Sequence, residues 1–341
     1  MQNTAQIPFT LSEAQQHTMG AALYQYLNIK IHDYIKEKAF DTILIVGKYD
    51  RQSNISKYEK TGKKANWQRP TARLEGRVLW IEVFPGMDYV RHYAALISTY
   101  FAINDLPMPT VQYCLPTEAD CWVPIHESDL SQLTPTEYVI TGYALPEIAK
   151  DTHWQEYDTF HAQQTTIGGK TVTFVSVKHS FWGDIGGRLV AHWATLGFEK
   201  VIFIGKVGGL KAAFQPNGHL ATGHCSLVEG EVICWDNIFA DVKEAVVQHG
   251  PHISSPSVLF ETKEWLQLMQ DRFSFVDPEI GQFARAAVRH GVGFGYLHLI
   301  SNTLVENNQE NLSNERHPNI LKKRAALIAT LQAILYTTIS S

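Results

Sequence analysis

Short apolar runs of strand length alternate along the chain with longer stretches whose apolar residues recur at helical spacing. Residues 13–39 have the helical spacing, and a second helix is predicted over residues 87–103. Strands are predicted at FDTILIVG (40–47), RVLWIEVF (77–84) and TVQYCL (110–115). Alternation of this kind is typical of an α/β fold.

A polar segment rich in Pro, Asp, Glu, Ser and Thr, residues 116–135, interrupts the pattern and predicts a linker. The alternation then resumes, with strands expected at 138–143, 171–177, 201–205 and 294–300 and helices at 185–196, 262–271, 278–290 and 317–337. We therefore expect a smaller N-terminal α/β domain of unknown role over residues 1–135. A second domain, with a mixed sheet flanked by helices, should occupy residues 136–341.

Composition narrows the class of protein. Hydrophobic residues make up 45% of the 341 residues and charged residues 18%, which suits a folded chain with sizeable cores. The formal net charge of −5 gives no general attraction to nucleic acid or to anionic membranes. No signal peptide is evident at the start, and the C-terminal apolar stretch is shorter than the ~20 residues of a membrane span. The four cysteines form no CxxC pair and indicate reduced thiols, so we expect a cytoplasmic protein that does not enter a membrane.

Glycines follow the buried run VIFI in the segment GFEKVIFIGKVGGL. Gly205, Gly208 and Gly209 would let the backbone approach a ligand closely at the carboxyl end of a strand. Their spacing matches neither the phosphate-binding pattern GxxxxGK[ST] nor the dinucleotide pattern GxGxxG. A tight strand-exit turn with no ligand is the alternative interpretation.

The segment VDPEIGQFARAAVRHGVGFGYLHLISN (276–302) places a carboxylate at a predicted helix start and an amide after an apolar run. Asp277 is a good N-cap, Pro278 suits the first helical position, and Glu279 complements the helix dipole. Capping alone therefore explains the helix start, and Asn302 could be an ordinary turn residue. The alternative is that Glu279 and Asn302 face a common ligand.

The ordered segments KVIFIGKVGGL, QPNGHLATGH, VDPE and SN resemble the nucleoside phosphorylase and nucleosidase superfamily. YVITGYALPEIAK and GGKTVTFVSVKHSFWGDIGG resemble that family's first strand and turn and its second hairpin. The resemblance runs from about residue 138 to residue 302 and leaves residues 1–135 uncovered. It implies the family's mixed sheet, a purine nucleoside or nucleotide as the small-molecule partner, and a homo-oligomer.

The resemblance also implies roles for single residues. Glu279, beside Pro278, takes the place of the glutamate that binds the ribose hydroxyls, and Asn302, after Ser301, that of the group near purine N7. An asparagine can donate a hydrogen bond to N7 but cannot protonate it, and it occurs in the family branch that prefers 6-oxopurines. Phe260, in SSPSVLFETKEW, is the candidate for stacking on the base, with a core phenylalanine as the alternative.

The family's phosphate site is not reproduced. The turn at 142–147 has no arginine, and Asp184 stands near a position where the family has a serine or threonine. A carboxylate there would repel phosphate, since two like charges ~4 Å apart cost on the order of 4 kcal/mol at an effective dielectric of about 20. The nearby groups that could restore a positive site are Lys178, His179, Arg188 and Lys206. A solvated lysine is the simpler interpretation of Lys206.

These departures leave three functions open. Water could replace phosphate as the nucleophile, with Asp184 or His179 positioning it, and we favour this hydrolysis of a purine N-glycosidic bond over phosphorolysis. The domain could instead have kept the fold and lost the chemistry, as a nucleotide-sensing or interaction module. We expect no metal and no cofactor, with phosphate open as a co-substrate.

A basic segment with aromatic residues spans residues 51–77. It contains Lys57, Tyr58, Lys60, Lys63, Lys64, Trp67, Arg69 and Arg73. It could hold the phosphates of a nucleotide, a nucleic-acid strand or an acidic protein, or it could be a solvated loop. If it folds over the C-terminal site, the substrate could be a nucleotide; we do not expect nucleic acid as a partner.

Overall fold

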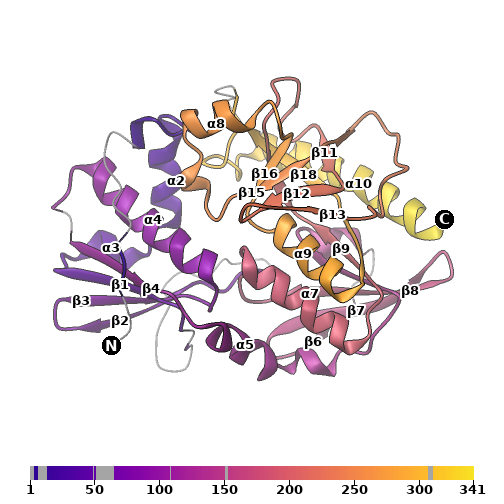
Figure 1. Ribbon diagram of the computed structural model, residues 1–341, viewed down its shortest axis with the longest axis horizontal. Coiled ribbons are helices and arrows are strands. Elements are labelled where there is room, and N and C mark those ends of the chain that lie inside the picture. Colours follow the sequence, from indigo (N-terminus) through magenta and orange to yellow (C-terminus); the bar gives the residue numbers. More distant parts are fainter. Residues whose placement is uncertain are drawn as a thin grey trace.

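The N-terminal part is a small α/β unit built on a four-stranded sheet. The computed structural model describes residues 4–6, 14–48, 50, 65–107, 109–149, 153–305 and 310–341 (Figure 1). The elements of this part are α2 (Ala22–Lys30), α3 (Asp33–Glu37), β1 (Thr42–Val46), β2 (Thr71–Glu75), β3 (Val78–Glu82), α4 (Met87–Asn104) and β4 (Thr110–Cys114). The strand order is β2-β3-β1-β4, with β1 parallel to β3 and to β4. The strands predicted at 40–47, 77–84 and 110–115 and the helix predicted over 87–103 are confirmed.

The predicted linker is wrong, because residues 116–135 fold. They form α5 (Glu118–His126) and η1 (Asp129–Gln132). Thr117 and Asp120 make a capping box at the start of α5, with the Thr117 hydroxyl accepting the N–H of Asp120. Cys121 and Ile125 are buried, and α5 packs against α7. The polar residues that suggested a linker are therefore the caps and the exposed face of a short helix.

The C-terminal part contains two mixed sheets among the described residues. A six-stranded sheet has the order β17-β9-β5-β8-β7-β6 and an eight-stranded sheet the order β13-β12-β15-β16-β10-β18-β11-β14. The first comprises β5 (Tyr138–Gly142), β6 (Gln155–Glu156), β7 (Phe160–Ile167), β8 (Lys170–Val177), β9 (Lys200–Ile204) and β17 (Gly293–Tyr296). The second comprises β10 (Lys206–Gly209), β11 (Leu220–Thr222), β12 (Cys225–Val228), β13 (Glu231–Cys234), β14 (Val247–His249), β15 (His252–Ser254), β16 (Phe275–Asp277) and β18 (His298–Thr303).

Helices flank these sheets, which confirms the predicted class of an α/β fold with mixed sheets. They are α6 (Leu145–Ile148), α7 (Asp184–Leu196), η2 (Val258–Phe260), α8 (Lys263–Met269), α9 (Ile280–His290) and α10 (Pro318–Ser340). Helices α7 and α9 lie side by side near the centre of Figure 1 and pack directly against each other. One hydrophobic cluster includes residues of both parts, among them Ile97 of α4 and Phe283 of α9.

The chain crosses from one sheet to the other at two points. Strand β9 ends at Ile204 and β10 begins at Lys206, so the chain changes sheets at Gly205. The predicted glycine turn is therefore wrong, because Lys206–Gly209 form a strand. A Cβ at Gly205 would lie 2.5 Å from His298 Nε2, which explains the glycine by packing. The single strand predicted at 294–300 is likewise two strands, divided at Leu297. No described helix has the length and apolar character required to cross a bilayer.

Removal of the capping box tests the assignment of α5 as an ordered helix. Thr117→Ala removes the oxygen that accepts the N–H of Asp120, so it should lower the free energy of unfolding by about 0.5–2 kcal/mol. Thr117→Ser keeps the acceptor and should stay close to the wild type. Chemical denaturation measures both variants. Equal stability of the alanine and serine variants would contradict an ordered helix start at this position.

Candidate active site

At the start of α9, the acid that caps the helix is a different residue from the acid expected to bind a ligand. Asp277 Oδ1 accepts the N–H of Glu279 at 2.9 Å and the N–H of Ile280 at 2.8 Å, so the carboxylate of Asp277 caps the helix. Pro278 is buried between the two acidic residues. The capping interpretation therefore applies to Asp277, and the side chain of Glu279 is not needed for it.

The carboxylate of Glu279 has no protein partner outside its own residue in the described part of the chain. No hydrogen bond or ion pair joins its oxygens to another described residue, and the residue keeps some solvent exposure. Burial raises its pKa well above the usual value, and the negative charges of Asp277 and Asp88 raise it further, whereas Lys206 lowers it. An acid in these surroundings has unused acceptor capacity, as a ligand-binding carboxylate needs.

The amide of Asn302 is oriented by its neighbour. Ser301 Oγ donates to Asn302 Oδ1 at 2.9 Å and lies 3.3 Å from Val207 O. With the oxygen engaged, the Nδ2 group of Asn302 is the free donor, because none of the described residues accepts a hydrogen bond from it. Asn302 is 7% exposed and lies within β18, not after the strand as predicted.

Strand β10 lies between the two candidate ligand groups. Gly208 pairs with Val276 of β16 on one side and with Asn302 of β18 on the other. Asn302 lies within β18, and Glu279 lies two residues past the end of β16, so the two residues are in or just beyond the strands that border β10. The glycines of β10 do not require a ligand to explain them. A Cβ at Gly208 would lie 2.9 Å from Leu304, and one at Gly209 would lie 2.9 Å from Phe214.

Lys206 is an ion-paired residue and not a solvated lysine. Its Nζ lies 2.6 Å from both carboxylate oxygens of Glu315, and Arg324 Nη2 lies 3.6 Å from the same carboxylate. Glu315 is held ionised, since these cations lower its pKa to about 2 against the opposing effect of burial. The positive charge of Lys206, which lowers the pKa of Glu279, is therefore paired with the carboxylate of Glu315.

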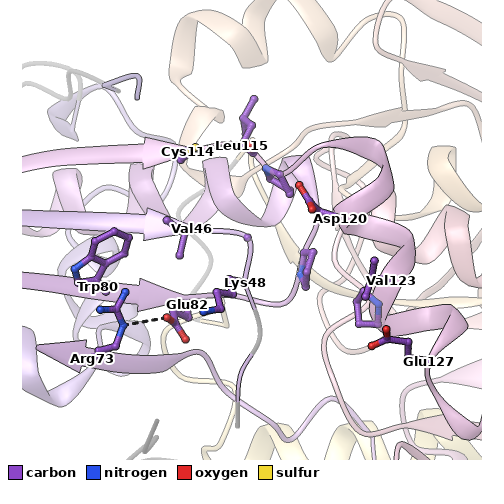
Figure 2. Close-up of a pocket in the computed structure, with 14 residues that line it drawn as sticks. Val46, Lys48, Arg73, Trp80, Glu82, Cys114, Leu115, Asp120, Val123 and Glu127 are labelled. Carbon is purple, nitrogen blue, oxygen red and sulfur yellow. Dashed lines mark hydrogen bonds and ion pairs between the residues drawn. The ribbon is translucent and has the colours of Figure 1, made fainter. Parts of the chain in front are cut away.

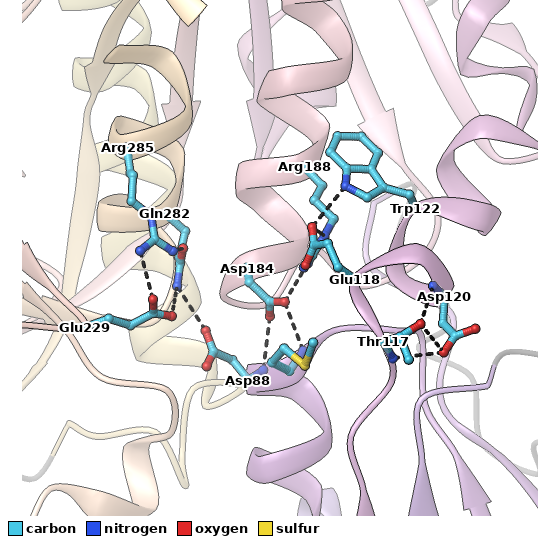
Figure 3. Close-up of polar contacts among 11 residues, drawn as sticks. Asp88, Thr117, Glu118, Asp120, Trp122, Asp184, Arg188, Glu229, Gln282 and Arg285 are labelled. Atoms are coloured by element: carbon cyan, nitrogen blue, oxygen red, sulfur yellow. Dashed lines mark hydrogen bonds and ion pairs between the residues drawn. The ribbon is translucent and has the colours of Figure 1, made fainter. Parts of the chain in front are cut away.

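Asp184 holds the N-terminal end of α4 (Figure 3). Its two oxygens accept the N–H of Met87 at 2.9 Å and the N–H of Asp88 at 3.0 Å. Arg188, one turn later in α7, donates to Asp184 at 2.5 Å and to Glu118 of α5 at 2.5 Å. Because both oxygens already accept hydrogen bonds, the contacts give Asp184 a structural role, and its position as a group that holds the nucleophilic water stays a prediction.

His179 lies just beyond the carboxyl end of β8 and is 3% exposed. Its Nδ1 donates to Ser180 O at 2.6 Å, and its ring stacks on Phe84 with the ring centres 3.8 Å apart. Burial lowers the pKa of His179 to about 4, so the imidazole is neutral at physiological pH. Its Nε2 is buried without a hydrogen-bond partner among the described residues, which leaves one acceptor unused.

Phe260 ends the short helix η2, in a segment held between the two parts of the chain. Ser257 Oγ lies 2.8 Å from His92 Nδ1 of α4, and Trp182 Nε1 donates to Pro256 O at 2.9 Å. Phe260 is partly buried and packs against the main hydrophobic cluster. Its proposed contact with a base stays a prediction.

Glu261 and Asp88 are buried acids that the sequence did not single out. Glu261 is 4% exposed, and burial together with the charge of Asp277 raises its pKa well above the usual value. Asp88 is 4% exposed and accepts from Gln282 Nε2 of α9 at 3.3 Å. Both positions looked like ordinary helix-start acids, since Glu261 precedes the N-cap of α8 and Asp88 lies in the first turn of α4.

The basic segment 51–77 is described only from residue 65. Trp67 and Gln68 donate backbone N–H groups to Lys178 O, and Asn66 donates to Val177 O. Residues 66–68 therefore hydrogen-bond to the carboxyl end of β8, and the segment continues into β2. The lysines predicted at 57, 60, 63 and 64 lie outside the described residues.

Comparisons with known proteins give distant matches. No protein-family model matches the chain. The oxidoreductase cns1 of Cordyceps militaris is 24% identical over 236 residues, which cover 61% of this chain and 30% of that protein. The chain thus spans less than a third of the length of this curated relative.

Solved structures similar to the chain include two named hydrolytic enzymes and a phosphorylase. The uridine phosphorylase of Vibrio fischeri is 14% identical, with a TM-score of 0.48 over 61% of this chain and 93% of its own. The futalosine hydrolase of Helicobacter pylori is 13% identical, with a TM-score of 0.46 over 61% of this chain and 98% of its own. The 5′-methylthioadenosine/S-adenosyl homocysteine nucleosidase of Campylobacter jejuni is 13% identical, with a TM-score of 0.45 over 59% of this chain and 99% of its own.

Two substitutions near Glu279 should shift the pKa of its carboxyl group in opposite directions, and this pair of shifts tests the surroundings described above. Asp88→Asn removes a negative charge that raises this pKa and should lower it, whereas Lys206→Met removes a positive charge that lowers it and should raise it. The titration of labelled glutamate carboxyl groups, followed by NMR, measures both shifts. Glu264→Gln, an exposed change in α8, is the control and should leave the value unchanged. Shifts of the same sign in the two test variants would contradict this arrangement.

Proposed function

We propose that the C-terminal part cleaves the N-glycosidic bond of a purine nucleoside or nucleotide, by hydrolysis rather than phosphorolysis. The observation that supports this proposal most is a pair of unused ligand groups beside β10, one just past the end of β16 and one within β18. They are the carboxylate of Glu279 and the Nδ2 donor of Asn302. The sequence resemblance implies the same two residues, with Glu279 as the group that binds the ribose hydroxyls and Asn302 as the group that binds the base.

The chemistry requires a carboxylate close to the sugar. Cleavage builds positive charge on the ribose, and an anion that accepts from both the 2′ and 3′ hydroxyls holds the ring and stabilises that charge. Glu279 has the free acceptors for this role when it is ionised. Because its pKa is raised, ligand binding should require a pH above the usual carboxyl range.

The base is the leaving group, and Asn302 would stabilise it by donation to N7. Ser301 fixes the amide so that Nδ2, and not Oδ1, faces the ligand. An amide cannot transfer a proton, which favours a 6-oxopurine, whose departure depends less on protonation by this residue. Phe260 would supply the stacking surface.

Hydrolysis is favoured because the cations that could hold phosphate are already engaged. Lys178 donates to Tyr157 O and lies 3.4 Å from Glu156, Arg188 pairs with Glu118 and Asp184, and Lys206 pairs with Glu315. His179 is neutral at physiological pH. A phosphate bound beside the three cations would have to displace their carboxylate partners.

His179 is the better of the two groups proposed to position water. Its Nε2 has an unused lone pair because Nδ1 carries the proton, whereas the oxygens of Asp184 accept from Met87, Asp88 and Arg188. A homo-oligomer remains part of the proposal through the resemblance alone. An oxidoreductase activity is not proposed, because the glycines after β9 lack the GxGxxG spacing.

A nucleotide-sensing module without catalysis is the second candidate. It is favoured by the structural role of Asp184, which removes one of the two groups predicted to direct a nucleophile. In that case Glu279 and Asn302 would bind the ligand without breaking a bond.

Release of free base separates these functions. The pure protein is incubated with inosine, adenosine, AMP and ATP, with and without phosphate, and the base is measured by chromatography. We expect release without phosphate, with an inosine-type base preferred. Release only with phosphate would establish phosphorolysis, and tight binding with no release would establish the sensor.

Single variants test the assigned roles. Glu279→Gln keeps the shape but removes the charge, and it should lower kcat/KM by about 10²–10³-fold. Asn302→Ala should lower it by a similar factor, and Ser301→Ala by about tenfold because the amide loses its orientation. Glu264→Gln on the surface of α8 is the matched control. Full activity of Glu279→Gln would contradict the proposal.

A further inference from the structure

Two of the four cysteines face each other across the hairpin that β12 and β13 form. Cys225 begins β12 and Cys234 ends β13, and the two residues are direct partners in the antiparallel ladder. Their Sγ atoms lie 2.8 Å apart, and both thiols are free. Because a disulfide bond is about 2.05 Å long, a small movement of the two side chains would bring the sulfur atoms to bonding distance.

The turn of this hairpin fixes the register of the two strands. Glu229 and Gly230 connect β12 to β13, and their φ angles of 51° and 83° are both positive, as a two-residue type I′ turn requires. From such a turn outwards, hydrogen-bonded and non-hydrogen-bonded residue pairs alternate along the ladder. The local sequence of the turn therefore decides how Cys225 and Cys234 meet.

Cys225 and Cys234 form a non-hydrogen-bonded pair. Trp235 donates its backbone N–H to His224 O at 2.9 Å, and this bond lies just outside the two cysteines. In such pairs the Cα atoms are about 4.5 Å apart and the side chains are at their closest. That spacing falls within the range of roughly 4.4–6.8 Å that a disulfide bond can bridge.

The residue that follows each of these cysteines is anchored in the fold. Ser226 Oγ lies 2.8 Å from His252 Nδ1, and Trp235 is 8% exposed and belongs to the main hydrophobic cluster. At the turn, the carboxylate of Glu229 accepts from Arg285 Nη1 of α9 at 2.8 Å. Because both strands and the turn have such partners, the two sulfur atoms are held opposite each other in the reduced protein.

The two thiols differ in their access to solvent. Cys234 is exposed on β13, which is an edge strand of the eight-stranded sheet. Cys225 is partly buried, and burial together with its contact with Cys234 raises its pKa to about 11. The thiolate is the reactive form, and a thiol of raised pKa forms little of it. Cys234 is therefore the thiol that an oxidant in solution should attack first.

The other two cysteines lie in the N-terminal half of the chain and are buried. Figure 2 shows Cys114 at the end of β4, where it lines a cavity of about 450 Å³. Cys114 is 5% exposed, and Cys121 of α5 has an exposure of 0%. Burial raises the pKa of both thiols. Both should therefore react more slowly than Cys234 with an oxidant in solution.

We propose that Cys225 and Cys234 are a redox modification site, at which a hydroperoxide forms a reversible disulfide bond between β12 and β13. The site is separate from Glu279 and Asn302 and does not rest on the function proposed above. The bond would tie the edge strand β13 covalently to its neighbour.

The reaction has two steps. The Cys234 thiolate attacks the O–O bond of hydrogen peroxide, an S–O bond forms, and the departing oxygen takes up a proton and leaves as water. The Cys225 sulfur then attacks the resulting sulfenic acid, the S–S bond forms as the S–O bond breaks, and the hydroxide leaves as water with the proton of Cys225. Two thiols and one peroxide thus give one disulfide and two water molecules, and a dithiol reverses the change by exchange.

Thiol counting on the full chain tests this site. The reduced protein is treated with hydrogen peroxide at low protein concentration, the remaining thiols are alkylated, and the products are analysed by intact-mass and peptide mass spectrometry. The wild type should lose two of its four thiols and contain one link within the chain, between Cys225 and Cys234. Cys114→Ala, which leaves the pair intact, is the matched control and should form the same link at the wild-type rate.

Two single variants test the order of the steps. Cys225→Ser should stop at a sulfenic acid on Cys234, which dimedone traps, and should form no link. Cys234→Ser should lose its first thiol roughly tenfold more slowly than the wild type, because Cys225 is partly buried and its pKa is raised. Thermal denaturation shows that each variant is folded. Two results would overturn the proposal: no link between Cys225 and Cys234 in the oxidised wild type, or oxidation of Cys234→Ser as fast as that of the wild type.

Discussion

The hydrogen bonds from the start of α9 to Asp277 are the constraint on which the candidate site depends. Asp277 is 5% exposed, and its Oδ1 accepts two backbone N–H groups while it lies 3.0 Å from His252 Nε2. The carboxylate of Asp277 thus accepts hydrogen bonds from the first backbone N–H groups of α9. Without it, those groups would need another acceptor, and Glu279 is the next acid in the chain. Glu279 therefore does not cap the helix and keeps free acceptor oxygens. Burial and the nearby carboxylates of Asp277 and Asp88 disfavour its ionised form.

A helix cap joins the two parts of the chain. Asp184 at the start of α7 accepts two N–H groups from the start of α4, those of Met87 and Asp88. Burial and the charge of Asp184 raise the pKa of Asp88 to about 7. Because Asp88 also accepts from Gln282 of α9, the N-terminal part is tied to the helix that Glu279 begins. The aspartate that the motif comparison placed near the nucleophile therefore serves the junction between the parts.

The sequence predicted most of the long, regular elements because their apolar periodicity is strong, although the helix expected over residues 13–39 is instead the two separate helices α2 and α3. Helices α4, α7, α9 and α10 and strands β1, β3, β4, β5 and β8 lie close to their expected positions. It failed where the signal was tertiary or short. Strand β10 consists of four residues with two glycines, and Leu297 divides an unbroken apolar run because the chain changes sheets there. Helix α5 was missed because its caps were taken for linker residues, although Thr117 and Asp120 have the capping-box spacing.

The candidate site was predicted in part for the same reasons. The motif order located Glu279 and Asn302, but only the hydrogen bonds distinguish the capping acid from the free one and the engaged amide oxygen from the free nitrogen. The roles of Asp88 and Glu261 depend on burial by residues distant in sequence, which no local pattern encodes.

A crystal structure of the protein with bound inosine would test the central claim most directly. The account predicts that both ribose hydroxyls donate to Glu279, that Asn302 Nδ2 donates to N7, and that Asp277 continues to cap α9. A nucleoside bound elsewhere, with Glu279 turned towards protein groups, would contradict it.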